Sequence, residues 1–164
     1  MTDRFVTHST FVIEHTYSAT PAKVFAAFAS AEAKSHWFAG GDTQNPSPLQ
    51  LDFRVGGREK CVGGPPDRPI HTYEAIYHDI VPDQRYVATY NMWEGDELIS
   101  VSLATAELQP LGTGTKLVYT EHGAYLVDKE QPIHREHGTR EMLIGALSAY
   151  LEHEQAGQLL KSGK

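Results

Sequence analysis

The stretch that decides the fold is GTREMLIGALSAYLEHE, which runs from Gly138 to Glu154. Within it Leu143, Leu147 and Leu151 recur every four residues, and this is the spacing of one face of an α-helix. The opposite face carries arginine, glutamate and histidine side chains. The pattern predicts a long amphipathic C-terminal helix whose apolar stripe packs against the rest of the fold. The residues after Gly157 are polar and are predicted to be loose.

The chain before this helix alternates polar and apolar residues in short segments separated by turn residues, which is typical of antiparallel strands. One such segment, Phe11 to Tyr17, lies near the N-terminus. The six others follow one another, and we predict them at residues 51–55, 58–62, 73–80, 86–93, 98–108 and 115–122.

Two short helices are predicted between the first two strands. Thr20-Pro21 is a helix start, because threonine is a good N-cap and proline is tolerated at the first helical position. Ser30 is placed to cap a second helix over residues 31–34. Residues 123–137, between the last strand and the long helix, are polar and are predicted to be irregular.

The order of elements is therefore strand, two helices, six strands and one long helix. Strands in one run with helices at the two ends indicate an α+β fold rather than a βαβ one. We predict a single domain over residues 1–164, with its core at about 10–155. In it an antiparallel sheet of about seven strands curls around the long helix, and an apolar cavity lies between them.

Composition excludes several classes of function. The chain has 14 Lys and Arg against 21 Asp and Glu, a formal net charge of −7. We therefore expect no nucleic-acid partner and no binding to an anionic membrane, since both require clustered basic residues. There is one cysteine, no signal-peptide pattern and no apolar run long enough for a membrane span. These features predict a cytoplasmic protein.

Several motifs, taken together and in order, are similar to those of a known family. They are TPAKVF at 20–25, HWF at 36–38, DFRVGG at 52–57, IVPDQRY at 80–86 and GTGTKL at 112–117. The chain resembles the START-like, or SRPBCC, superfamily, and within it the branch named for activators of the heat-shock-protein-90 ATPase. The resemblance covers the chain from Phe11 to Glu154.

This resemblance implies the helix-grip fold, in which a long helix lies across a curved sheet with a cavity between them. It implies no single reaction, because superfamily relatives include lipid carriers, hormone receptors, aromatic cyclases and co-chaperone domains. One feature departs from the family pattern. The branch often has a Gly-Trp pair at the start of the last helix, whereas here Gly138 is followed by Thr139. We expect the missing indole to leave room on the helix side of the cavity.

The candidate ligand site is this cavity, lined by aromatic residues of the predicted elements and by the apolar stripe of the helix. Aromatic side chains supply large apolar area, and Tyr and Trp each add a polar group. The alternative is that these residues are ordinary core. The predicted lining residues are Trp37, Phe38, Phe53, Tyr73, Tyr77, Tyr90, Trp93, Tyr119, His122, Leu143, Leu147 and Tyr150.

Two histidine arrangements are candidates for chemistry. His134 and His137 are spaced to meet a metal ion, but no third ligand is evident, so a solvated pair is the favoured interpretation. His122 and Tyr125 are an acid–base pair if both face the cavity mouth, and surface residues otherwise.

Three further polar residues and the cysteine have structural interpretations that we favour. Asp52, Arg54 and Arg58 flank a double glycine, where they form either an ion pair that fixes a hairpin or an anion-binding patch. Cys61 lies in a predicted strand without a nucleophile motif. No phosphate-binding loop, dinucleotide-binding glycine pattern or nucleophile elbow occurs, so we expect no cofactor and no metal.

Three functions follow as hypotheses. The first is binding of a small hydrophobic or amphipathic molecule in the cavity. The second is an enzyme of the cyclase, isomerase or hydrolase kind that uses the same cavity and needs polar residues inside it. The third is a chaperone-interacting protein, which needs an exposed apolar patch. Pairing of two copies of the chain through exposed strands or loops is left open.

Overall fold

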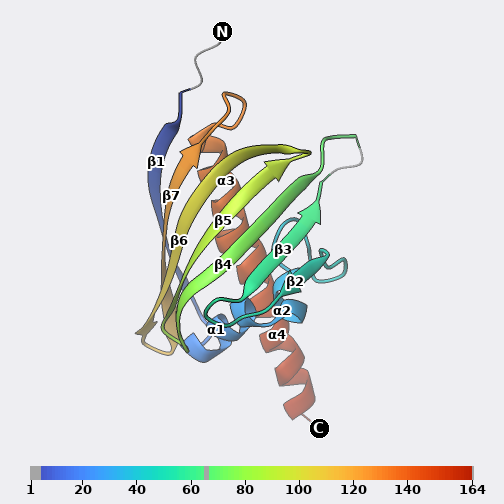
Figure 1. The fold of residues 1–164 in the computed structure, drawn as a ribbon. Helices are drawn as coiled ribbons and strands as arrows, with labels where there is room; N and C mark the ends of the chain where they lie inside the picture. The colour runs from blue at the N-terminus through green and yellow to red at the C-terminus, as the bar shows by residue number, and fades with distance from the viewer. Residues whose placement is uncertain (1–4, 65–66, 164) are drawn as a thin grey trace.

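The computed structural model describes residues 5–64 and 67–163. It consists of a curved antiparallel sheet with a long helix lying across one face (Figure 1). The seven strands are ordered β1-β7-β6-β5-β4-β3-β2. The predicted α+β helix-grip fold is therefore confirmed. The strands are β1 (Thr7–Tyr17), β2 (Leu49–Leu51), β3 (Arg58–Gly63), β4 (His71–Val81), β5 (Arg85–Glu94), β6 (Glu97–Leu111) and β7 (Gly114–Tyr125).

The two short helices lie at one end of the sheet (Figure 1). They are α1 (Pro21–Ala29) and α2 (Ala31–Ser35). The caps are those predicted, since the Thr20 hydroxyl accepts from the Lys23 N–H at 3.4 Å and the Ser30 hydroxyl accepts from the Ala33 N–H at 3.2 Å. Such caps satisfy backbone donors that the first turn leaves free.

Strand alternation decides which side chains face the helix. In β1, Phe11 and Ile13 are buried and Val12 between them is exposed. In β7 the buried set is Leu117, Tyr119 and further residues at every second position. The inner face of the sheet thus forms the core with the helices, and the other face meets solvent.

The C-terminal helix is longer than predicted. It comprises α3 (Pro132–Arg140), a π-helical segment η1 (Glu141–Ala146) and α4 (Leu147–Ser162). The prediction that residues 123–137 are irregular was wrong at both ends, because β7 continues to Tyr125 and the helix begins at Pro132, and it is confirmed for residues 126–131 between them. The residues that α3 buries are Arg135 and Thr139, so a search for apolar periodicity could not reveal this helix. The tail predicted to be loose is helical to Ser162.

The apolar stripe behaves as predicted, since Leu143, Leu147 and Leu151 are all buried. The π-helical turn contains the first of these leucines. The Leu143 carbonyl oxygen accepts a hydrogen bond from the Tyr17 hydroxyl at 2.6 Å, and this bond joins the π-helical turn to β1. Single π-helical turns are frequent at functional sites. None of the described helices is long and apolar enough to cross a membrane.

The predicted strand at residues 51–55 was wrong in its bounds, because β2 ends at Leu51 and the chain then turns tightly before β3. Gly57 permits this turn, since a Cβ at that position would lie 2.0 Å from the Asp52 carbonyl oxygen. Arg54 Nε lies 2.8 Å from an Asp52 carboxylate oxygen, and both side chains are exposed. This confirms the interpretation of these two residues as a hairpin ion pair.

Candidate functional site

A cavity of about 380 Å³ lies between the inner face of the sheet and the C-terminal helix. Its volume is within the ~300–1,000 Å³ typical of small-molecule sites. The helix closes one side with Gly138, Thr139, Met142 and Leu143. Gly138 and Thr139, where the family often has a Gly-Trp pair, therefore form part of the cavity wall. The aromatic residues that line the cavity are Phe28, Trp37, Phe38, Tyr73, Tyr86, Tyr90 and Tyr119.

The structure brings half of the predicted lining residues together. Those that line the cavity are Trp37, Phe38, Tyr73, Tyr90, Tyr119 and Leu143. Four of these rings pack in series, since Trp37 and Phe38, Phe38 and Tyr73, and Tyr73 and Tyr90 have centroids 6.1, 5.0 and 4.7 Å apart. These four rings form a continuous part of the aromatic wall.

Five of the other predicted residues belong to the surrounding core or surface. The Phe53 ring packs edge-on against the Tyr77 ring with centroids 4.8 Å apart, and neither lines the cavity. Leu147 is fully buried in the core. Tyr150 stacks on the His36 ring outside the cavity. Trp93 has the opposite strand parity to Tyr90 and is half-buried away from the lining.

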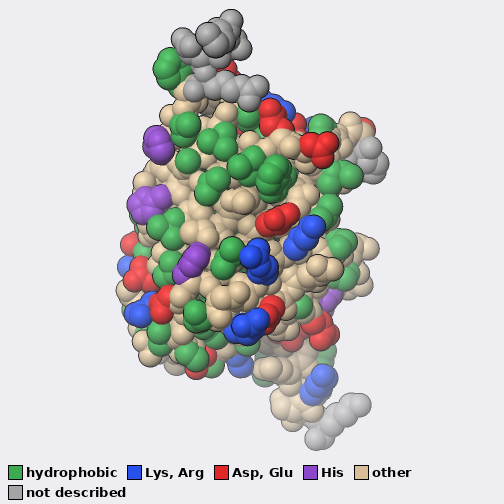
Figure 2. Space-filling view, in the orientation of Figure 1, with side chains coloured by type: hydrophobic (Ala, Val, Ile, Leu, Met, Phe, Trp, Pro, Cys, Tyr) green, Lys and Arg blue, Asp and Glu red, His purple; other side chains and the backbone are tan. Residues whose placement is uncertain are grey.

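The prediction that His122 lines the cavity was wrong. It directly follows an inward-facing residue of β7 and therefore points to the outer face, where its Nδ1 lies 2.7 Å from the Thr10 hydroxyl. Figure 2 looks onto that outer face, where hydrophobic side chains gather over the upper part of the sheet. Tyr125 is buried on the inner side, so the predicted acid–base pair of these two residues does not form.

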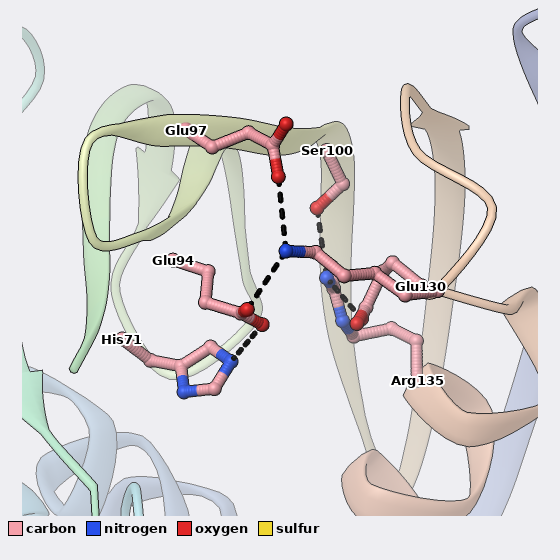
Figure 3. Close-up of polar contacts among 7 residues, drawn as sticks. His71, Glu94, Glu97, Ser100, Glu130 and Arg135 are labelled. Atoms are coloured by element: carbon pink, nitrogen blue, oxygen red, sulfur yellow. Dashed lines mark hydrogen bonds and ion pairs between the residues drawn. The ribbon is translucent and has the colours of Figure 1, made fainter. Parts of the chain in front are cut away.

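Arg135 of α3 brings a positive charge to the helix side of the cavity. Its guanidinium donates to the Tyr90 hydroxyl at 2.9 Å, to the Ser100 hydroxyl at 2.7 Å and to a Glu130 carboxylate oxygen at 2.8 Å. Figure 3 shows the last two contacts. The Arg135 side chain is only 9% exposed. Charge-assisted hydrogen bonds of this kind are the stronger ones in proteins, so they fix the helix on the sheet.

Glu121 of β7 is a buried carboxyl in the same wall. Its Oε1 accepts from the Tyr90 hydroxyl at 2.8 Å and from the Tyr119 hydroxyl at 2.9 Å. Its Oε2 has no hydrogen-bond partner among the residues that the structure describes. Burial raises the pKa of Glu121 above its usual 4.5, against the lowering effect of Arg135 and the two tyrosine hydroxyls. The group therefore holds its proton more tightly than an exposed glutamate.

A second buried charge pair lies toward the two short helices. Lys34 Nζ, from α2, is 2.8 Å from Glu59 Oε1, and the two side chains are 3% and 0% exposed. The Tyr77 hydroxyl donates to the same oxygen. Lys34 also lies over the Phe38 ring, 4.6 Å from its centroid. Lys34 lines the cavity, whereas Glu59 lies outside the lining.

Some of the lining residues are exposed and mark the mouth of the cavity, among them Gly63 and His134. Close by, Lys129 bridges the carboxylates of Glu94 at 2.8 Å and Glu97 at 2.9 Å, and His71 lies 3.3 Å from Glu94 (Figure 3). These side chains are partly exposed, and exposed ion pairs of this kind contribute little to stability. They join the β5–β6 turn to the segment before α3.

The remaining candidates have structural roles. His137 lies 3.0 Å from Glu141 on the exposed helix surface. Within residues 5–64 and 67–163 no group of three His, Cys, Asp or Glu is placed to hold a metal ion. Cys61 lines the cavity, and burial raises the pKa of its thiol.

The residues that sequence reasoning missed are the buried charges Lys34, Glu59, Glu121 and Arg135. A signal existed for Glu121, because it shares strand parity with Tyr119. A signal also existed for Glu59, which shares parity with Cys61. Neither Lys34 nor Arg135 had one, because only the packing of their helices shows where they point.

The sequence model of the family described as activator of Hsp90 ATPase homolog 1-like protein matches residues 18–152. The chain belongs to this family. The predicted resemblance is confirmed, and with it the helix-grip fold of the START-like superfamily. No curated protein matches the chain in sequence.

Three solved structures are similar to this member of the family. Mll3558 from Rhizobium loti is 43% identical, with a TM-score of 0.81 over 89% of this chain and 99% of its own. A protein from Rhizobium leguminosarum is 38% identical, with a TM-score of 0.86 over 93% and 99%. DynU16, from the dynemicin biosynthetic locus, is 13% identical with a TM-score of 0.64 over 87% and 47%, which shows a shared fold alone.

The raised pKa of Glu121 predicts how stability depends on pH. Between its unfolded pKa and its higher folded pKa, the folded protein binds a proton that the unfolded chain has released, so stability falls as pH rises. Glu121→Gln removes this dependence. We expect wild type to lose stability relative to the variant from about pH 4.5 upward, by about 1.4 kcal/mol for each pH unit between the two pKa values. Urea denaturation across that range measures it, and a constant difference would contradict the assignment.

Proposed function

We propose that the protein binds a small, largely aromatic ligand with one polar end in the cavity between sheet and helix. The observation that carries the proposal is the combination of a wall of aromatic rings with a buried polar group formed by Tyr90, Glu121 and Arg135. Apolar surface supplies affinity, while a few placed polar groups fix orientation. A cavity that served only as core would not need buried charges in its lining.

A thermal-shift screen tests this proposal with flavonoids, polyketide-like aromatics, simple indoles and fatty acids as probes. A ligand present at 100 times its Kd stabilises the folded state by about 2.7 kcal/mol. For a chain of this size that corresponds to a rise in Tm of roughly 5–10 °C. We expect aromatic probes to reach this range and saturated fatty acids to fall below it. No shift from any probe at saturating dose would overturn the proposal.

An enzyme that uses the same cavity is the second candidate, and Glu121 favours it. Burial raises the pKa of this carboxyl, and a raised pKa is the direction that suits a glutamate to general acid–base catalysis. The probes that bind should then be converted, and mass spectrometry after incubation detects this. Glu121→Gln should abolish conversion, while probes without an amine should still bind. Probes recovered unchanged after prolonged incubation would exclude this reaction for them.

A further inference from the structure

Glu121 has one carboxylate oxygen occupied and one free. Both tyrosine hydroxyls donate to Oε1, and Oε2 receives no hydrogen bond from residues 5–64 and 67–163. The residue is 1% exposed and lines the cavity. A buried polar atom without a partner is costly. The partner for Oε2 is therefore either a proton or a group that enters the cavity.

The charges around the cavity leave one carboxyl without a cation. Lys34 pairs with Glu59 at 2.8 Å, and Arg135 pairs with Glu130 at 2.8 Å. Glu121 makes no ion pair with a described residue and meets Arg135 only through the Tyr90 hydroxyl. When Glu121 is ionised, the two cations that line the cavity, Lys34 and Arg135, are each paired with another carboxylate, and Glu121 is a third carboxylate without a cation. The ionised cavity thus carries one uncompensated negative charge, which a ligand is able to neutralise.

The aromatic surroundings of Glu121 suit a cation as well. Tyr90 and Tyr119 hold its other oxygen, and Tyr73 packs on Tyr90. Aromatic faces attract cations, and the attraction is stronger at sites shielded from water. An anionic ligand would instead add a second unpaired negative charge beside Glu121.

On the basis of the proposed function, we propose that the cavity selects an aromatic ligand whose polar end is a protonated amine or amidine, and that this end donates an N–H to Glu121 Oε2. The ligand's positive charge neutralises the negative charge that the cavity residues leave uncompensated at Glu121. The aromatic body of the ligand then lies along the tyrosine wall.

The proposal implies that a proton and the ligand's cation compete for Glu121. Affinity for an amine should rise with pH, by up to about tenfold per unit, while Glu121 is protonated in the free protein. Affinity for a neutral analogue should not rise with pH. The titratable and charged groups that face Glu121 are Tyr86 and Tyr90 from β5, Tyr119 and Tyr125 from β7 and Arg135 from α3. Glu130 pairs with Arg135, and His71 of β4 and His134 of α3 line the same cavity.

Three indoles with the same two-carbon arm test the proposal by calorimetric titration. They are tryptamine with an ammonium end, tryptophol with a hydroxyl and indole-3-propionate with a carboxylate. At about pH 7.5 we expect wild type to bind tryptamine at least tenfold more tightly than tryptophol, and indole-3-propionate most weakly. Glu121→Gln should weaken tryptamine binding much more than tryptophol binding, so that the two affinities come to within about threefold of each other. His122→Gln, the neighbouring residue on the outer face, is the matched control and should change nothing.

The outcomes separate the two proposals. Binding of tryptophol without any preference for tryptamine, or an equal loss of both in Glu121→Gln, would overturn the cation inference and leave the proposed function standing. Failure of all three indoles to bind would overturn the cation inference, and it would overturn the proposed function as well only if no probe of the thermal-shift screen binds. If Glu121→Gln does not fold, wild type alone decides. Its preference for tryptamine over tryptophol must increase as the pH rises above 4.5, the usual pKa of a glutamate, and a constant ratio overturns the inference.

Discussion

Lys34→Met should lower the free energy of unfolding by about 3–5 kcal/mol, which is the usual effect of removing one partner of a buried ion pair. The variant leaves the Glu59 carboxylate, whose side chain is 0% exposed, without its cation. It also removes the ammonium group from the Phe38 ring face. Chemical denaturation of wild type and variant measures the difference.

Two controls separate this effect from a general cost of losing a lysine. Replacing both Lys34 and Glu59 with methionine should recover most of the stability, because an apolar pair of similar volume is often as stable as a buried ion pair. Arg54→Met breaks the exposed pair with Asp52 and should cost less than about 1 kcal/mol. If Lys34→Met costs no more than Arg54→Met, the pair does not have the role assigned to it.

Cys61→Trp should weaken binding of aromatic probes at least tenfold, a loss of about 1.4 kcal/mol or more. Cys61 lies on β3, is 5% exposed and lines the cavity. A large side chain at an inward-facing strand position enters the space that the ligand needs. Calorimetric titration of tryptophol into wild type and variant measures the change, and circular dichroism checks that the variant is folded.

Val62→Trp is the matched control for this experiment. Val62 is the next residue of the same strand, is 39% exposed and does not line the cavity. Successive side chains of a strand point to opposite faces, so the added indole lies outside. The affinity of the Val62→Trp variant for tryptophol should equal that of wild type. Equal losses in the two variants would mean that the ligand does not occupy the cavity.

The parts of the fold that were predictable are those with signals confined to a few neighbouring residues. Thr20 and Ser30 show helix starts by their capping chemistry, and the leucine stripe around Leu147 shows the buried face of the helix. Strand positions follow from alternation and turn residues. The start of α3 was not predictable in this way, because its buried residues are Arg135 and Thr139 and no apolar period marks them.

The candidate site was predictable in its aromatic half only. Tyr73, Tyr90 and Tyr119 have the residue type expected of a cavity wall. Charged residues are rarely buried, so a reading based on residue type assigns Glu121 to the surface. Strand parity with Tyr119 contradicts that assignment, and the same parity excludes His122. The pairing of Lys34 with Glu59 depends on how α2 docks on the sheet, which no local pattern reveals.

The most direct test of the central claim is whether a ligand occupies the cavity, and the methionines report on it. The chain has three, and two of them, Met92 of β5 and Met142 of η1, line the cavity from its sheet and helix sides. In a protein labelled with carbon-13 at the methionine methyls, saturating tryptophol should shift both resonances and give nuclear Overhauser effects from its ring to both methyl groups. Bound tryptophol that leaves both methyl resonances unchanged would contradict the account.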